Sequence, residues 1–290
     1  MTDASARIAL ERRSAETAAL LPDLVAKADA AAQVVLAGRH PRQKAGRSDT
    51  FWQFRDYTPG DPVASIDWRQ SARLDRRLLV RQTEWEQPQT FCLWCGGDED
   101  FDYAGDVKDT KRFVGQVITL ALGMIALRAG ERVAIWGPEE PPRAGHQVSP
   151  LLAETLIRSE TKLDQLQPRS GAIHLLVSDF HTEPEELHRA FDRVRDVRGQ
   201  AVAVVVEDPS EEEFAYQGSR RFEGPKGEAR KFFGDTGAVR AAYLEARAAH
   251  HDALRRAVRG PDEAVIFHRT DQALPPLLMQ ISQRFAEERA

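Results

Sequence analysis

Short apolar runs alternate with helical segments between residues 90 and 288, and this alternation limits the possible folds more than any other feature of the sequence. Five runs have the length and composition of β-strands: FCLWC, ERVAIWG, GAIHLLVSDF, QAVAVVVED and EAVIFHR. Segments with helical patterning, such as TKRFVGQVITLALGMIALRAG, separate them, while residues 221–233 indicate a β-hairpin or an excursion at the sheet edge. Strands that alternate with helices in this way predict an α/β fold with a doubly wound, mainly parallel sheet.

The first 86 residues differ in pattern from the rest of the chain. Residues 3–36 are rich in Ala and Leu at helical spacing and predict a helix, and residues 38–49 form a polar, basic stretch. Between residues 51 and 85, turn signals separate short aromatic or aliphatic runs, which indicates a β-rich segment. We therefore divide the chain into an N-terminal part, residues 1–86, and an α/β domain, residues 87–290.

Composition and absent motifs argue against several classes of function. The 290 residues carry 40 basic and 45 acidic side chains, so no overall basic excess points to nucleic acid as a partner. No apolar stretch approaches the roughly 20 residues of a membrane span, and no signal-peptide pattern is present, so we expect a cytoplasmic protein. The sequence contains no phosphate-binding loop of the GxxxxGK(S/T) type, which argues against nucleotide hydrolysis by the chain itself.

The two cysteines, Cys92 and Cys95, form a CxxC pair within a predicted strand. Side chains of a strand alternate between its faces, so the two thiols are expected to point to opposite sides of the sheet. The residues that follow are two glycines and several acids, which would raise a thiol pKa rather than lower it. We interpret both cysteines as buried apolar residues rather than as a redox or metal-binding pair.

Acidic residues follow two of the predicted strands. Asp98, Asp100 and Asp102 come after the strand that ends at Cys95, and Asp179 lies at the end of GAIHLLVSDF. Ligands of doubly wound sheets bind at the carboxyl ends of the strands, so both groups belong to the same edge. Carboxylates suit Mg²⁺ or Ca²⁺, and a solvated acidic loop is the plainer alternative. The residues alone leave both interpretations open.

The stretch FRDYTPGDPVASIDWRQSARLDRRLLVRQTEWE, residues 54–86, carries the most information. Its TPGD predicts a tight turn, and its DWR triplet suggests a carboxylate–guanidinium network beside a large aromatic ring. Residues 38–81 hold ten Arg or Lys against five acids, while residues 82–109 hold one Lys against eight acids. Either these blocks neutralise each other within the fold, or the segment presents arginines beside an aromatic ring at an interaction surface.

This stretch closely resembles the hallmark of the domain-of-unknown-function family numbered 58, whose members carry an F…R-x-Y-x-x-G-D…I-D-W-x-x-S-A-R…L-x-V-R-x…E core. The upstream GRHPRQKAGRSDTFW also fits the family's G-x-H…G…F lead-in. The resemblance covers residues 36–136. Nine residues of the stretch, which rarely occur together, form either a structural signature or a candidate interaction surface: Arg55, Tyr57, Gly60, Asp61, Asp67, Trp68, Arg69, Arg73 and Arg81. All of them except Arg69 stand at positions of the family core.

The resemblance implies a von Willebrand factor A-like, Rossmann-like α/β domain after the signature segment. Proteins of this family look like partners of MoxR-type AAA+ ATPases, and such pairs are thought to assist the assembly, maturation or metal loading of a client protein. A MoxR-type ATPase and a client protein are therefore the implied partners. The resemblance names a role rather than a reaction.

The chain departs from related proteins at the metal-ion-dependent adhesion site. Related proteins have D-x-S-x-S after the first strand, where an aspartate and two hydroxyls bind Mg²⁺ and leave a position for a partner's carboxylate. Aligned on the strand end, this chain has Gly96 at the aspartate and Asp98 and Asp100 at the serines, while Asp179 matches a later acidic position. Because a glycine supplies no ligand, we expect a degenerate site that holds either no cofactor or a weakly bound Mg²⁺ or Ca²⁺.

Two functional hypotheses follow from these features. The first is a non-enzymatic interaction or assembly-factor domain that acts with a MoxR-type ATPase in the maturation of other proteins. The second is a metal-dependent hydrolase or phosphoryl-transfer enzyme built on Asp98, Asp100 and Asp179. Binding of a divalent cation distinguishes the two, because only the second requires it.

Overall fold

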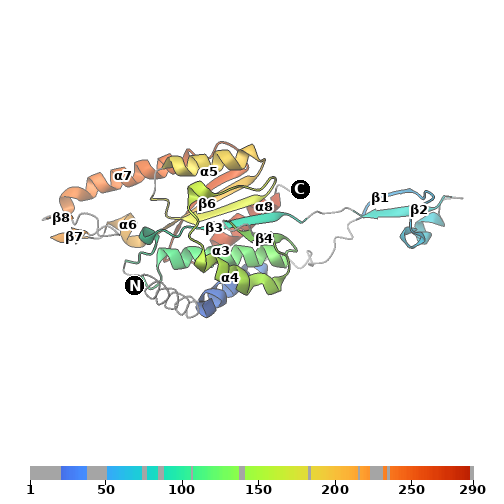
Figure 1. The fold of residues 1–290 in the computed structure, drawn as a ribbon, viewed down its shortest axis with the longest axis horizontal. Coiled ribbons are helices and arrows are strands. Elements are labelled where there is room, and N and C mark those ends of the chain that lie inside the picture. The colour runs from blue at the N-terminus through green and yellow to red at the C-terminus, as the bar shows by residue number, and fades with distance from the viewer. Residues whose placement is uncertain are drawn as a thin grey trace, which may run out of the picture. The chain divides into compact units, whose positions relative to one another are not determined.

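The chain divides into two compact units, one that contains the α/β domain and one that contains the signature segment. They comprise Met1–Pro41 with Gln89–Ala290, and Arg42–Pro88. The computed structural model describes residues 21–37, 51–73, 77–83, 88–105, 107–136, 141–181, 184–214, 216–222, 231–233 and 236–287 (Figure 1).

A five-stranded parallel sheet forms the centre of the α/β unit. Its strands lie in the order β4 (Arg132–Ile135), β3 (Thr90–Cys95), β5 (Ile173–Ser178), β6 (Gln200–Glu207) and β9 (Glu263–Arg269). β5 and β6 are almost wholly apolar and buried, as expected of strands that are covered on both faces. The expected doubly wound, von Willebrand A-like α/β fold is confirmed.

Helices cover both faces of this sheet (Figure 1). One face carries α3 (Lys111–Arg128), α4 (Ser149–Arg158) and α8 (Leu274–Glu287). The other face carries α5 (Pro184–Asp196) and α7 (Gly237–Arg255), and the short helix α6 (Pro209–Glu213) follows β6. α3 is buried along nearly its whole length and forms the centre of the larger core. Within the described ranges, no helix has the length and apolarity needed to cross a membrane.

The described part of the N-terminal helix, residues 21–37, belongs to the α/β unit. Leu24, Ala28 and Val35 are buried in the same core as α3 and α8. The structure thus differs from our division at residue 86, which grouped this helix with the signature segment. Helical spacing reveals the apolar face of a helix, but it does not reveal which distant surface covers that face. The predicted helical residues 3–20 and the basic stretch 38–49 lie outside the described residues.

Two antiparallel pairs of strands lie outside the central sheet. In the signature unit, β1 (Phe51–Asp56) pairs with β2 (Leu79–Thr83), and the connection includes the 3-10 helix η1 (Val63–Ser65) and the one-turn helix α2 (Trp68–Ser71). The strands and turns expected in this segment are therefore present. In the α/β unit, β7 (Arg220–Phe222) pairs with β8 (Lys231–Phe233), which agrees with the hairpin pattern of residues 221–233.

The two cysteines of β3 pack on opposite faces of the sheet. Cys92 lies in the core that contains α5 and α7, and Cys95 lies in the core that contains α3. Both are buried free thiols. Burial raises the pKa of Cys92 to about 11 and the pKa of Cys95 to about 12. These properties agree with two packing residues and do not suit redox chemistry.

Both thiols are expected to resist alkylation in the folded chain. A free thiol, with a pKa of about 8.5, is partly thiolate at pH 8, whereas these two stay protonated and shielded. We expect iodoacetamide at pH 8 to modify neither cysteine in buffer and both in urea, as read by mass spectrometry. An Ala64→Cys variant, at an exposed position, should react at once and serves as the positive control. Rapid native modification of Cys92 or Cys95 would contradict the packing interpretation.

Candidate functional site

The carboxyl ends of β3 and β5 form the edge at which sheets of this topology bind ligands. The chain leaves β3 for β4 on one side, while β5 pairs with β3 on the other, so the direction of winding changes between β3 and β5. Gly96 and Gly97 follow β3, and Asp179 and Phe180 follow β5. The Gly96 N–H donates to the Val177 carbonyl at 2.8 Å, which holds the two strand ends side by side. We call this edge the β3–β5 rim.

Gly96 leaves no room for the aspartate of an adhesion site. A Cβ atom added at Gly96 would lie 2.5 Å from Ser178 Oγ and 3.0 Å from Ser178 Cβ, well inside van der Waals contact. Ser178 is the last residue of β5, and it is buried. The serine side chain therefore fills the space in which an aspartate side chain at position 96 would begin.

A lysine supplies a cation inside the rim. Lys111, the first residue of α3, has a side chain that is only 1% exposed. Its Nζ lies 2.9 Å from Asp179 Oδ2 and 2.7 Å from Glu211 Oε1. Burial by itself lowers the pKa of Lys111, but the two carboxylates outweigh burial and raise it. We call Lys111, Asp179 and Glu211 the lysine cluster, in which one fixed ammonium bridges two acids.

Local backbone structure positions the members of this cluster. The Thr110 side chain caps α3 by accepting from the Phe113 N–H at 3.2 Å, which sets the start of the helix at Lys111. On α6, Glu211 uses its two carboxylate oxygens separately. Oε2 accepts from the Asp208 N–H at 2.8 Å in a capping box, and Oε1 binds Lys111. Helix capping thus fixes both the cation and one of its acids.

His181 is the solvent-facing neighbour of the lysine cluster. Its Nδ1 lies 3.5 Å from Asp179 Oδ2, its Nε2 lies 3.7 Å from Glu211 Oε1, and 46% of its side chain is exposed. The His181 ring lies 6.4 Å from the ring of His250. Burial lowers the pKa of His250, whose Nε2 is 2.9 Å from the Phe180 carbonyl oxygen. His181 thus faces the same two carboxylates as Lys111, from the solvent side.

A network of hydroxyl groups joins α6 to the loop that precedes α3. Tyr103 Oη lies 2.7 Å from Tyr216 Oη and 3.1 Å from Ser210 Oγ. Ser210 Oγ donates to Asp208 Oδ1 at 2.6 Å, and the Gly105 N–H donates to Asp208 Oδ2 at 3.0 Å. Burial raises the pKa of Tyr103, so its hydroxyl stays protonated at neutral pH. This network holds the loop and α6 against each other around Lys111.

The predicted metal residues do not gather at the rim. Asp98 and Asp100 have exposed side chains, and Arg112 donates to the carbonyls of Gly97 and Asp98, which fixes the loop backbone. The Asp179 carboxylate is instead bound by the lysine. Across the described ranges, no group of three or more His, Cys, Asp or Glu side chains is arranged to hold a metal ion. The residues present at the rim therefore do not fit the metal of an adhesion site.

Two signature residues hold the TPGD turn of their unit together. The Arg55 guanidinium donates to both carboxylate oxygens of Asp61, each at 2.6 Å, and these hydrogen bonds hold the pKa of Asp61 well below its usual range. Gly60 has φ +118°, a conformation that favours glycine, and the Asp61 N–H donates to the Thr58 carbonyl at 3.0 Å. The predicted tight turn is confirmed.

Asp67 has a different role from the one that the DWR triplet suggested. Its Oδ1 accepts from the Gln70 N–H at 3.0 Å, so Asp67 caps α2 rather than pairing with Arg69. The backbone N–H of Tyr57, a half-buried residue, donates to the Leu78 carbonyl at 2.7 Å and continues the strand pairing. A one-turn helix begins directly after Asp67, and the cap satisfies a backbone N–H at its first turn that has no partner within the helix.

Three of the remaining signature residues have side chains without a hydrogen-bonded or ionic partner among the described residues. They are Trp68, Arg69 and Arg73, and all three are exposed. Arg81 lies opposite Phe54 in the β1–β2 register, and its side chain lies outside the described part of the unit. The signature therefore combines structural residues with a set of exposed ones.

The match to a protein family covers the signature unit and most of the α/β unit. The family model described as "Protein of unknown function DUF58" matches residues 53–253, which is more than half of the chain. The chain belongs to the DUF58 family. The resemblance found in the signature motif is thereby confirmed, although the motif is only a small part of the matched DUF58 region.

Two solved structures show a distant likeness to this DUF58 chain. One is the conserved hypothetical protein BatB from Bacteroides thetaiotaomicron, with 10% identity, a TM-score of 0.38, and coverage of 70% of this chain and 98% of that one. The other is an aerotolerance-related membrane protein from Bacteroides fragilis, with 12% identity, a TM-score of 0.34, and coverage of 70% and 100%. No curated protein matches the chain.

Lys111 and Glu211, which complete the cluster around Asp179, were not predicted from the sequence. One local signal was available for the lysine. A cation directly after a helix cap opposes the helix dipole, so Lys111 at the start of α3 indicates an acidic partner from elsewhere in the DUF58 fold. Glu211 lies in a run of three glutamates, and nothing in that run distinguishes it from its neighbours.

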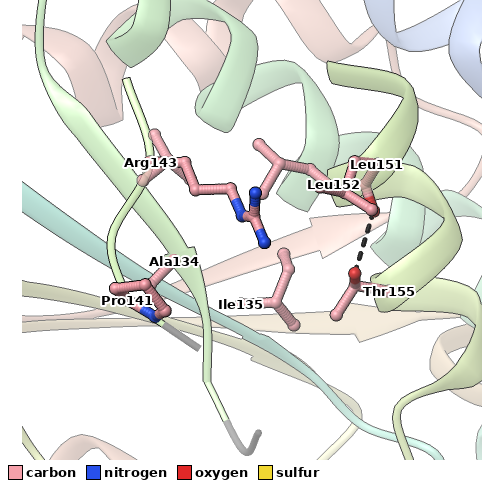
Figure 2. Close-up of a pocket in the computed structure, with 8 residues that line it drawn as sticks. Ala134, Ile135, Pro141, Arg143, Leu151, Leu152 and Thr155 are labelled. Atoms are coloured by element: carbon pink, nitrogen blue, oxygen red, sulfur yellow. Dashed lines mark hydrogen bonds between the residues drawn. The ribbon is translucent and has the colours of Figure 1, made fainter. Parts of the chain in front are cut away.

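A small pocket beside β4 lies apart from these groups. Figure 2 shows the Arg143 side chain extending over an otherwise mostly apolar lining that includes Ile135, Leu152 and Thr155. The Thr155 hydroxyl donates to the Leu151 carbonyl at 2.9 Å and is thus satisfied within α4. No residue of the lysine cluster lines this pocket, and it offers no acid or base for chemistry.

Proposed function

We propose that this DUF58 chain is a non-enzymatic interaction domain that acts with a MoxR-type AAA+ ATPase in the maturation of a client protein, in the cytoplasm. The lysine cluster is the observation that carries the non-enzymatic part of the proposal. The MoxR partnership is supported by the resemblance of the signature segment to its family.

At this rim the lysine cluster takes over the structural role that a divalent cation has in an adhesion site. In an adhesion site, a metal neutralises converging acids and holds the strand ends in a fixed geometry. Here the Lys111 ammonium bridges Asp179 and Glu211 and offsets one of their two negative charges without an exchangeable ion. A rim built in this way does not need a bound metal for its stability. It therefore suits a binding surface better than a catalytic centre.

The alternative, a metal-dependent hydrolase or phosphoryl-transfer enzyme, requires open carboxylates around a cation. At this rim the Asp179 carboxylate is occupied by Lys111, and Asp98 and Asp100 are turned to solvent. No observation on the rim favours the enzyme over the interaction domain, so cation binding is the measurement that decides between them.

Titration with divalent cations is expected to release or absorb no heat of specific binding. We expect isothermal calorimetry with Mg²⁺, Ca²⁺ and Mn²⁺ to show no dissociation constant below the millimolar range, because the one buried acid of the predicted trio already has a cation. Asp179→Ala should give the same flat trace as wild type. The matched control is Asp164→Ala, at an exposed acid outside the rim. Saturable binding that Asp179→Ala abolishes and Asp164→Ala preserves would establish the metal-dependent alternative.

Association with the ATPase is tested directly by co-purification. A tagged MoxR-type ATPase from the same cell is expected to retain the chain in at least one of three states: nucleotide-free, ADP-bound or bound to a non-hydrolysable ATP analogue. Wild-type chain that has been treated with EDTA and desalted should be retained equally well, because the lysine replaces the metal. Failure to associate in all three states would contradict the proposed partnership.

A further inference from the structure

The signature unit exposes a large aromatic side chain. Trp68 is 60% exposed, and Val63, on the adjoining turn, is 61% exposed. By contrast, Trp94 and Trp136 of the α/β unit are buried. Exposed tryptophans are typical of protein interfaces, where they supply much of the binding energy.

The helical turn that carries Trp68 is held firmly. Asp67 caps it, and the Ser71 hydroxyl donates to the Asp67 carbonyl at 2.7 Å. The same hydroxyl accepts from the Leu79 N–H at 2.8 Å, which ties α2 to β2. A side chain on a backbone fixed in this way loses less conformational freedom on binding than one on a loose loop.

Some charged side chains of the signature unit have ionic or hydrogen-bonded partners, and others do not. The Asp61 and Asp56 carboxylates are paired with Arg55 and Arg77, and Asp67 is used as a helix cap. Each acid in the described part of the unit therefore already has a partner.

Two arginines next to the tryptophan lack such partners. Arg69 is the second residue of α2, Arg73 directly follows its C-cap Ala72, and both side chains are exposed. No described carboxylate neutralises either guanidinium. The turn thus presents two positive charges beside Trp68 that no carboxylate in the described part of the unit pairs with.

We propose that Val63, Trp68, Arg69 and Arg73 form a docking surface for an acidic segment of a partner protein that carries an apolar side chain between carboxylates. Guanidinium groups bind carboxylates through paired hydrogen bonds, and the indole supplies the apolar contact. The acidic occupant follows from charge complementarity. This inference deepens the proposed function, on which it rests, by naming the chemistry of the partner contact.

Single-stranded nucleic acid also stacks on aromatics beside arginines. The observations favour the protein segment because the chain has a formal charge of −5, so its overall charge does not attract a nucleic-acid backbone. Nucleic acid is therefore an outcome of the test rather than part of the proposal.

Fluorescence anisotropy of a labelled peptide of repeated Glu-Glu-Leu units tests the proposal on the full chain. Wild type is expected to bind saturably, and more weakly as salt is raised. Arg69→Glu/Arg73→Glu and, separately, Trp68→Ala should each weaken binding by about tenfold or more, the effect expected of interface hot spots. The controls are Arg256→Glu and Met279→Ala, at exposed residues of the α/β unit, which should bind as wild type does.

All four variants are at the surface and should unfold at the wild-type urea concentration, which separates lost binding from lost structure. Three results would overturn the docking surface: no peptide binding by wild type at low salt, equal binding by the Arg69 and Arg73 double variant, or preference for a labelled oligonucleotide over the peptide. Loss of self-association in the variants, seen by sedimentation, would assign the surface to a second copy instead.

The ATPase co-purification keeps the two proposals distinguishable. If the ATPase retains both wild type and the double arginine variant, the proposed function stands and the docking surface does not mediate it. If the peptide binds only wild type and no ATPase is retained, the docking surface stands and the MoxR partnership fails.

Discussion

Replacing Lys111 with Met is expected to lower the free energy of unfolding by about 3–5 kcal/mol, the range for removing one partner of a buried ion pair. The ammonium is buried between Asp179 and Glu211, at 2.9 Å and 2.7 Å. Methionine has a similar length and keeps most of the packing, but it leaves two adjacent carboxylates without a cation. Urea unfolding at neutral pH, followed by circular dichroism, measures the loss.

A matched substitution and a double variant show whether the effect belongs to the lysine cluster. Lys108→Met, at an exposed lysine just before α3, should change the free energy of unfolding by less than about 0.5 kcal/mol. Glu211→Gln should cost less in the Lys111→Met background than in wild type, because the two residues act as one network. A loss below about 1 kcal/mol for Lys111→Met would mean that water solvates these charges and would contradict the buried cation.

The lysine cluster also predicts a loss of stability at alkaline pH. The pKa of Lys111 is raised in the folded chain, so the folded state binds its proton more tightly than the unfolded state does. The stabilisation is fully present below the unfolded pKa of about 10.4 and is lost as pH rises through the folded pKa. Buried thiols and tyrosines also destabilise the fold in this range, but they are shared by wild type and Lys111→Met. The difference in stability between the two proteins should therefore shrink as pH rises above about 10.4, and a constant difference would contradict the assignment.

Gly96→Asp is expected to destabilise the chain by about 3 kcal/mol or more, although it restores the aspartate of related metal sites. The new Cβ would lie 2.5 Å from Ser178 Oγ, so Ser178 or the strand end must move, which costs about 1–3 kcal/mol. The new carboxylate would also be buried next to Asp179 without a cation of its own, which adds to the loss. We expect a lower urea midpoint and no gain in Mg²⁺ binding.

The contact with Ser178 is tested by a double-mutant cycle. Gly96→Ala should cost less in a Ser178→Gly background than in wild type, because that change removes both of the nearest atoms. The control is Gly260→Asp, at a glycine with nothing within 4 Å of an added Cβ, which should be close to neutral. Tight Mg²⁺ binding by a stable Gly96→Asp chain would show that the rim can still accept the metal.

The fold was largely predictable because its signals are local. Each strand of the parallel sheet is a short apolar run, and each covering helix has its own periodic face, so β3, β5, β6 and β9 could be placed from the sequence. The opposite orientation of Cys92 and Cys95 followed from strand geometry alone. The partner of the N-terminal helix was not predictable, because residues far along the chain in α3 and α8 supply its contact surface.

The candidate site was predictable only in part. The position of the rim and the lack of a ligand at Gly96 both follow from sequence, as does the confirmed TPGD turn. Asp67 pairs with a backbone amide rather than with Arg69, because a one-turn helix starts beside it and leaves that amide free. The lysine cluster could not be foreseen, since Lys111 is 68 residues from Asp179 and 100 residues from Glu211.

The sequence by itself determined the order of strands and helices, the family to which the chain belongs, and the absence of a metal ligand at position 96. Only the tertiary structure decided what binds Asp179: a buried lysine, positioned by a cap on α3 and shared with Glu211 from α6. The physical reason is that local patterns set backbone conformation, whereas the partners of a buried charge are set by which distant residues the fold brings within 3 Å of it.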